Sequence, residues 1–73
     1  MKFVVHDHGS PVYQAESLVD AYVWINREFK RRWPRAIYGQ QEAAAHGLHV
    51  VGTPELTPEE ARELRAVMRR ESR

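Results

Sequence analysis

Residues 17–34 read SLVDAYVWINREFKRRWP, and this stretch predicts the longest helix of the chain. Ser17 stands at the N-cap position with Asp20 three residues later, a pattern that satisfies free backbone N–H groups at the start of a helix. Pro34 ends the helix, because the residue before a proline is pushed out of helical geometry. Between these limits apolar residues repeat at the three- and four-residue spacing of one helix face: Leu18, Ala21, Tyr22, Ile25, Phe29 and, as a candidate continuation, Trp33.

A second set of apolar residues, Val19, Val23 and Trp24, lies off that face. A surface helix needs only one apolar face, so this surplus predicts burial against another element or against a second copy of the chain. We expect the protein to self-associate as a homodimer through these three residues. The alternative that stays open is that a further layer or helix of the same chain covers them.

The first fifteen residues predict a β-hairpin. Residues 2–6 and 12–15 have strand character, and residues 7–11 (DHGSP) form a turn cluster between them. Side chains alternate across a strand, so Phe3 and Val5 share the face that we expect to meet the core.

The second half of the chain predicts a short strand and another long helix. Residues 34–46 allow either a helix or a short strand; we favour a helix that ends at Gly47. Residues 48–52 (LHVVG) predict an apolar strand. Thr57 and Glu60 form a capping box at the start of the last helix. The apolar stripe of that helix consists of Ala61, Leu64, Val67 and Met68.

These elements predict an α+β fold in a single domain spanning residues 1–73, with the order ββα(α)βα. The third strand joins the hairpin in a three-stranded sheet, and the helices pack on one face of it. The other face stays open and is a natural docking surface. Depending on register, it shows His6, Tyr13 or Gln14, and His49 or Val51.

The length and composition of the chain limit the classes of function that we expect. Seventy-three residues supply one thin core, and without cysteine no disulfide supports it, which again favours self-association. The chain starts without the long apolar run of a signal peptide or a membrane span, so we expect a cytoplasmic protein with no membrane partner. A glycine-rich phosphate loop and a nucleophile–base pattern are both missing, and so small a fold has little room for a pocket of about 300 Å³ or more. We therefore predict no enzyme activity, no cofactor and no small-molecule substrate.

Basic residues gather in two blocks, residues 27–35 and 62–73, although the net charge is only +1. Arginine and lysine neutralise phosphates, and an exposed tryptophan stacks on a base, so nucleic-acid binding is the alternative function. Cations also favour the C-terminal end of any helix, which is the competing explanation. The residues that this alternative uses are Arg27, Lys30, Arg31, Arg32, Trp33, Arg35, Arg69 and Arg70.

Four histidines prompt a test for a metal site. His6 and His8 face the same side of a strand, and His46 and His49 approach them if the third strand lies beside the first. Their spacing matches no established ligand pattern, and residues 6–8 are placed partly in the hairpin turn. We therefore predict no metal site.

The leading interpretation is a small non-enzymatic protein-interaction module, self-associating or bound to a partner protein. Arginine outnumbers lysine nine to two and alanine is frequent, as expected of a GC-rich genome such as that of an actinobacterium or its phages. The opening hairpin, the SLVDAYVWI helix and the LTPEEARELRAVMRR tail are similar in pattern to many small proteins of those sources. That resemblance implies an accessory or regulatory protein that binds a host component, and it assigns no site residues.

Overall fold

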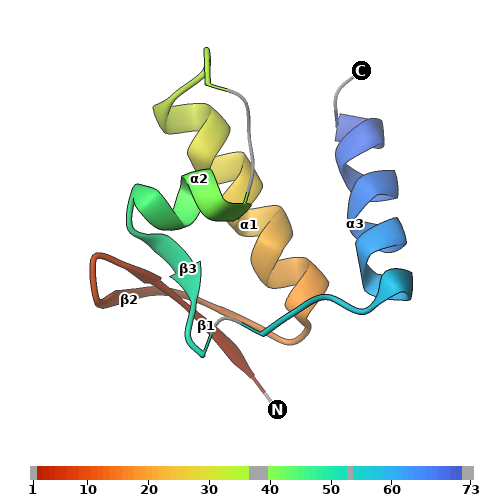
Figure 1. Ribbon diagram of the computed structural model, residues 1–73, viewed down its shortest axis with the longest axis horizontal. Helices are drawn as coiled ribbons and strands as arrows, with labels where there is room; N and C mark the ends of the chain where they lie inside the picture. Colours follow the sequence, from red (N-terminus) through yellow and green to blue (C-terminus); the bar gives the residue numbers. More distant parts are fainter. Residues whose placement is uncertain (1, 37–39, 53, 72–73) are drawn as a thin grey trace.

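The computed structural model describes residues 2–36, 40–52 and 54–71. Its elements follow in the predicted order (Figure 1): β1 (Phe3–Asp7), β2 (Ser10–Ala15), α1 (Leu18–Arg32), α2 (Gln40–Ala45), β3 (Leu48–Val50) and α3 (Pro58–Glu71). The α+β prediction is confirmed, including the three-stranded sheet. The preference for a helix before Gly47 is correct for Gln40–Ala45, which form α2, whereas residues 34–36 form a turn and a bend. The part of the predicted segment at residues 37–39 lies outside the described residues.

The sheet is antiparallel, with β1 between β2 and β3. Val5 at its centre lies opposite Tyr13 on one side and Val50 on the other. A bulge shifts the β1–β2 register after that point, so His6 pairs with Pro11 and leaves Val12 as the extra residue. Alternation then directs Val5, with its partners, toward the helices. Val5 is fully buried, as predicted for the core face.

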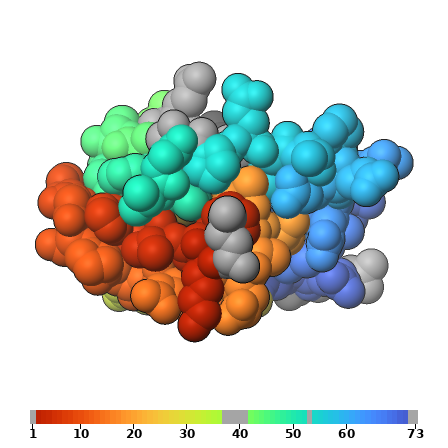
Figure 2. All heavy atoms as spheres, turned by 90° about the horizontal axis from the view of Figure 1, so that it is seen from below, coloured from red at the N-terminus to blue at the C-terminus, as the bar shows by residue number. Residues whose placement is uncertain are grey.

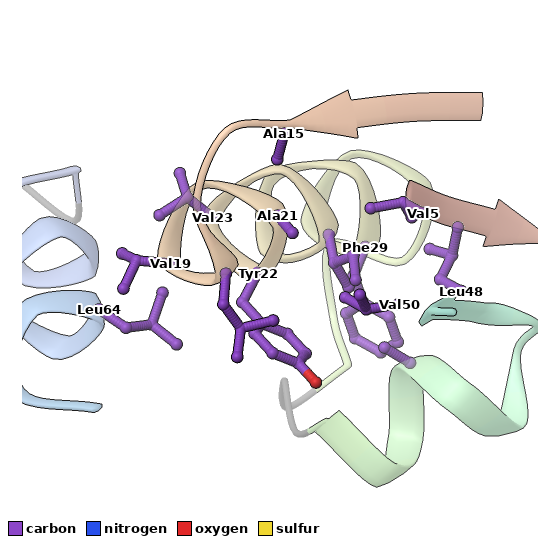
Figure 3. Close-up of a cluster of buried hydrophobic side chains, with 13 residues drawn as sticks. Val5, Ala15, Val19, Ala21, Tyr22, Val23, Phe29, Leu48, Val50 and Leu64 are labelled. Carbon is purple, nitrogen blue, oxygen red and sulfur yellow. The ribbon is translucent and has the colours of Figure 1, made fainter. Parts of the chain in front are cut away.

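The core lies between this face of the sheet and α1. Phe29, on the sheet-facing side of α1, is completely buried. On its other side α1 meets α3, where Leu64 lies beside Val19 (Figure 3). The molecule therefore has three layers in the order sheet, α1, α3. The buried apolar residues are Val5, Ala15, Leu18, Val19, Ala21, Tyr22, Val23, Ile25, Phe29, Ala43, Leu48, Val50 and Leu64.

Local signals set the helix ends. Ser17 Oγ accepts a hydrogen bond from the Asp20 N–H at 3.1 Å, which begins α1 as predicted. Thr57 and Glu60 exchange hydrogen bonds of 3.1 and 2.9 Å in the predicted capping box of α3. Gly47 ends α2 with φ +88°, and a Cβ at this position would meet the ring of His8 at 2.7 Å. Glycine is therefore favoured there by its positive φ, whereas the His8 ring is the end of an exposed side chain that can rotate away.

Two strand boundaries differ from the prediction. The hairpin turn is only two residues long, because His8 and Gly9 both adopt positive φ and reverse the chain within two positions. β1 therefore continues through Asp7, which the sequence placed in the turn. The third strand ends at Val50, and residues 51–52 form a turn instead of continuing it.

Candidate functional site

The residues predicted to form a dimer interface lie mostly inside the molecule. Val19 and Val23 are each only 6% exposed, because α3 covers that side of α1. Trp24 is partly exposed and stacks on Tyr13 of β2, with ring centroids 5.1 Å apart and planes 11° apart. Of the two possibilities that the sequence left open for Val19 and Val23, coverage by a helix of the same chain is the one realised. Self-association stays a prediction, but it needs a different surface.

The sheet offers that surface. All three helices lie on one side of it, and the three strands face the viewer in Figure 2, β1 and β2 in red and orange and β3 in teal. We call the uncovered side the open face. The Val51 N–H bonds to the Val4 carbonyl at 2.9 Å, which places these two residues opposite each other just beyond the His6–His49 pair. The open face consists of Val4, His6, Pro11, Gln14, His49 and Val51.

This placement settles the register that the sequence left undecided. Gln14 and His49 lie on the open face, whereas Tyr13 faces the helices and its hydroxyl donates a hydrogen bond to Asp20. Burial, followed by that bond, raises the pKa of Tyr13 above its usual value. Among the described residues, the exposed large hydrophobic side chains are Val12 and Val51, at 42% and 48%. Val51 belongs to the open face, and Val12 is the bulge residue at its edge.

A groove of about 520 Å³ lies on the opposite side of β3, between α1, α2 and the segment that leads to α3. Chain length suggested too little room for such a volume, and that expectation is wrong. The Tyr22 hydroxyl donates a 3.1 Å hydrogen bond to the Pro54 carbonyl and holds the segment across α1. Burial raises the pKa of Tyr22. The walls are mostly apolar: Tyr22, Ile25, Ala43, Ala44, Leu48, His49, Val50, Pro54, Glu55, Leu56 and Ala61.

Three of the arginines proposed for nucleic-acid binding are occupied within the chain. Arg27 pairs with Glu71 and so joins α1 to the end of α3. Arg31 and Arg32 both bond Glu28, and these contacts, Arg31 first, lower the pKa of the Glu28 carboxyl.

Arg32 also reaches from α1 to β1, where it donates a 2.9 Å hydrogen bond to Oδ2 of Asp7. This contact is the main cause of the raised pKa of Arg32. Both side chains are largely buried, at 29% and 20% exposed. The sequence assigned Asp7 to the turn, whereas the structure uses it to tie the sheet to the end of α1.

The remaining cations gather at one end of the molecule. The C-terminal ends of α1 and α3 point the same way, toward the top of Figure 1. Lys30, Arg35, Arg69 and Arg70 are exposed there, and within the described part of the chain none of them forms an ion pair.

Trp33, the aromatic member of the proposed nucleic-acid site, is engaged in the fold. Its ring stacks on His46 with centroids 4.2 Å apart and lies 5.2 Å from Phe29. It is partly buried against the core. Stacking on a base would therefore require it to leave an aromatic contact that it already makes.

The histidines divide into three environments. His6 and His49 are register partners on the open face, with ring centroids 5.9 Å apart. His8 lies in the turn over Gly47, and His46 stacks on Trp33. In residues 2–36, 40–52 and 54–71, no three His, Cys, Asp or Glu side chains form a group able to hold a metal ion.

Comparison with known proteins adds no relative: no protein family, curated protein or solved structure matches this chain. None of the described helices is long and apolar enough to cross a membrane.

Two features escaped sequence reasoning, namely the groove and the ion pair between Asp7 and Arg32. The groove depends on how the segment after β3 crosses α1, and no local pattern encodes that path. A signal for the ion pair did exist, because Asp7 alternates with Val5 and therefore shares its inward face.

Proposed function

We propose that this chain is a non-enzymatic protein-interaction module that docks through the open face of its sheet. The observation that carries the proposal is the one-sided arrangement of the helices, which leaves one face of the sheet uncovered by the described part of the chain. Sheets with one bare face are common, so the composition of that face is the second support.

The open face differs from the rest of the surface in charge. Its six residues include no Asp, Glu, Lys or Arg, whereas α3 exposes arginine and glutamate along its outer side. Interface centres in general are depleted in charged residues. Val51 is nearly half exposed there, next to the partly buried Val4.

A photo-cross-linkable residue tests this proposal in cells that produce the protein. Gln14 is exposed on the open face, and Glu63 is exposed on α3, so the two positions form a matched pair. We expect a discrete cross-linked protein from position 14 and none from position 63. Val51→Glu should abolish the cross-link without unfolding the chain. Equal cross-linking from both positions, or none from position 14, would contradict the proposal.

Nucleic-acid binding is the second candidate, and the observation that favours it is the basic end described above. Four exposed cations lie at or near the C-terminal ends of α1 and α3, and repulsion between them favours an anionic partner. The engagement of Arg27, Arg31 and Arg32 with carboxylates limits this site to about four phosphate contacts. On duplex DNA each contact contributes about −0.9 to the slope of log affinity against log salt, so affinity should fall about 100-fold between 50 and 200 mM salt.

Charge reversal at Lys30 and Arg70 separates this candidate from the first. The double variant should lose binding to all sequences about equally, whereas Lys2→Glu, at the other end of the molecule, should not. These two positions replace Arg31 and Arg32 as test sites, because reversal of those arginines would also break the contacts with Glu28 and Asp7. An anisotropy titration in low salt that shows no binding to DNA or RNA at tens of micromolar protein would exclude the candidate.

A further inference from the structure

The centre of the open face holds two histidines on adjacent strands. The His8 N–H bonds to the Gly47 carbonyl at 3.0 Å and the Val51 N–H to the Val4 carbonyl at 2.9 Å. His6 and His49 lie between these two contacts, so they occupy a hydrogen-bonded position of the ladder and project to the same side. Both residues are partly buried, and His49 also contributes to the wall of the groove on the other side of β3.

The spacing of the rings suits a metal ion. Imidazole nitrogens bind Zn²⁺ at about 2.0–2.1 Å, so two rings on one tetrahedral ion have centroids about 5 Å apart. The His6 and His49 centroids are 5.9 Å apart, with ring planes at 73°. Side-chain rotation closes this difference without movement of the backbone. Imidazole as a ligand selects Zn²⁺, Cu²⁺ or Ni²⁺ over Mg²⁺ and Ca²⁺.

One chain supplies only half of a tetrahedral set. No third described His, Cys, Asp or Glu joins the pair, so two of the four ligands must come from elsewhere. A second copy related by two-fold symmetry brings the same two imidazoles to the same axis, because such a contact places a patch against itself.

We infer that a divalent transition metal joins two copies of this chain through their open faces, with His6 and His49 of each copy as ligands. The inference rests on the proposed function for the docking surface, adds its occupant, and departs from the sequence-based prediction that the histidines form no metal site. The open face alone is too small for tight pairing. Its strands of five, six and three residues cover a rectangle of about 16 by 14 Å. Stable complexes bury roughly 800 Å² on each partner, which is several times the area of that rectangle. The metal supplies the affinity that this area lacks.

The charged residues near the open face also allow two copies to meet through it. Lys2 and Glu16, which flank β1 and β2, pair with each other at 3.9 Å. Two copies therefore meet without a surplus of like charge, and each cation can find a carboxylate in either copy.

Sedimentation velocity and titration calorimetry with zinc chloride test the inference on the whole chain. We expect a monomer in EDTA and a dimer once half an equivalent of zinc per chain is present. His6→Gln and His49→Gln should stay monomeric at the same zinc concentration, with unchanged circular dichroism. His8→Asn is the matched control, because asparagine tolerates the positive φ of that turn residue, and it should dimerise like the wild type.

Several results would overturn the inference: a monomer at saturating zinc, one zinc bound per chain without dimerisation, or a zinc-dependent dimer that survives His49→Gln. Loss of the dimer in His8→Asn would do so as well. The proposed function is tested apart from this, because position 14 should still cross-link in an EDTA-treated lysate of those cells if the partner is a different protein.

Discussion

Helix α1 and the three-stranded sheet each have two faces, and they use the second face differently. The second face of α1 is covered by α3, so Val19 and Val23 are each 6% exposed. The second face of the sheet is bare, and Val51 there is 48% exposed. The apolar surplus on the helix is therefore covered by a further layer of the same chain, whereas the face that the described helices leave uncovered lies where the sequence alternates between apolar and polar residues.

Replacement of Val23 with glutamate should produce the largest loss of stability. The variant tests whether the second face of α1 is buried in solution. A charge buried without a partner lowers the free energy of unfolding by about 3–5 kcal/mol. In a domain of this size, most molecules would then be unfolded. Val51→Glu is the matched control and should change the free energy of unfolding by less than about 0.5 kcal/mol. Urea unfolding followed by circular dichroism measures both. A folded, monomeric Val23→Glu variant would mean that Val23 lies on the surface in solution.

Leu64→Ala should rank second. Leu64 is the one residue of α3 in the buried class and packs beside Val19, so its removal should cost about 2–4 kcal/mol. Because α3 shields the second face of α1, we also expect the variant to aggregate or bind a hydrophobic dye more than the wild type. If its stability matched that of the wild type, α3 would not be the cover of that face.

The comparison also shows which parts of the fold were predictable. Helix ends and the order of the elements follow from local chemistry: the Ser17 and Thr57 caps, the stop at Pro34 and the left-handed Gly47 are all readable within a few residues. Alternation along β1 also predicted that Val5 would be buried.

Long-range contacts were not predictable in the same way. Leu64 of α3 lies beside Val19 although it comes about forty-five residues further along the chain, and no local pattern distinguishes α3 from a second copy as the cover of this side of α1. The His6–His49 pairing likewise depends on which strand lies beside β1. From the sequence, the approach of the two histidines depended on whether the third strand lies beside the first. The strand order β2-β1-β3 shows that it does.

Loss of the α3 cap should have a moderate effect. Thr57→Ala removes the side chain that accepts the Glu60 N–H, at a cost of about 1 kcal/mol. Hydrogen exchange should then speed up in the first turn of α3 and at Val19, which lies beside Leu64 of that helix, while amides of β1 keep their protection. Equal acceleration in β1 would show that the two faces of α1 do not open separately.

The smallest effect concerns the ionic contacts on the two faces of α1. Glu28 bonds Arg31 and Arg32, and through Arg32 it supports the contact with Asp7 of the sheet, whereas Glu71 of α3 bonds the exposed Arg27. The pKa of Glu28 is lowered in the folded protein, so its contribution is present above the ordinary value of 4.5 and is lost as the pH falls through the lowered pKa. Glu28→Gln should therefore cost about 0.5–1 kcal/mol at pH 7, and the gap to the wild type should close in acid below pH 4.5.

Glu71→Gln should cost less and lose its effect in high salt, because solvent and ions screen the Arg27 pair. Urea titrations at pH 7 and pH 3 measure the first variant, and a salt series at pH 7 measures the second. If the Glu28→Gln gap stayed the same in acid, the charge of Glu28 would not be its cause. If Glu71→Gln lowered the free energy of unfolding more than Glu28→Gln, the ionic contact of α1 with α3 would stabilise the fold more than its contact with the sheet.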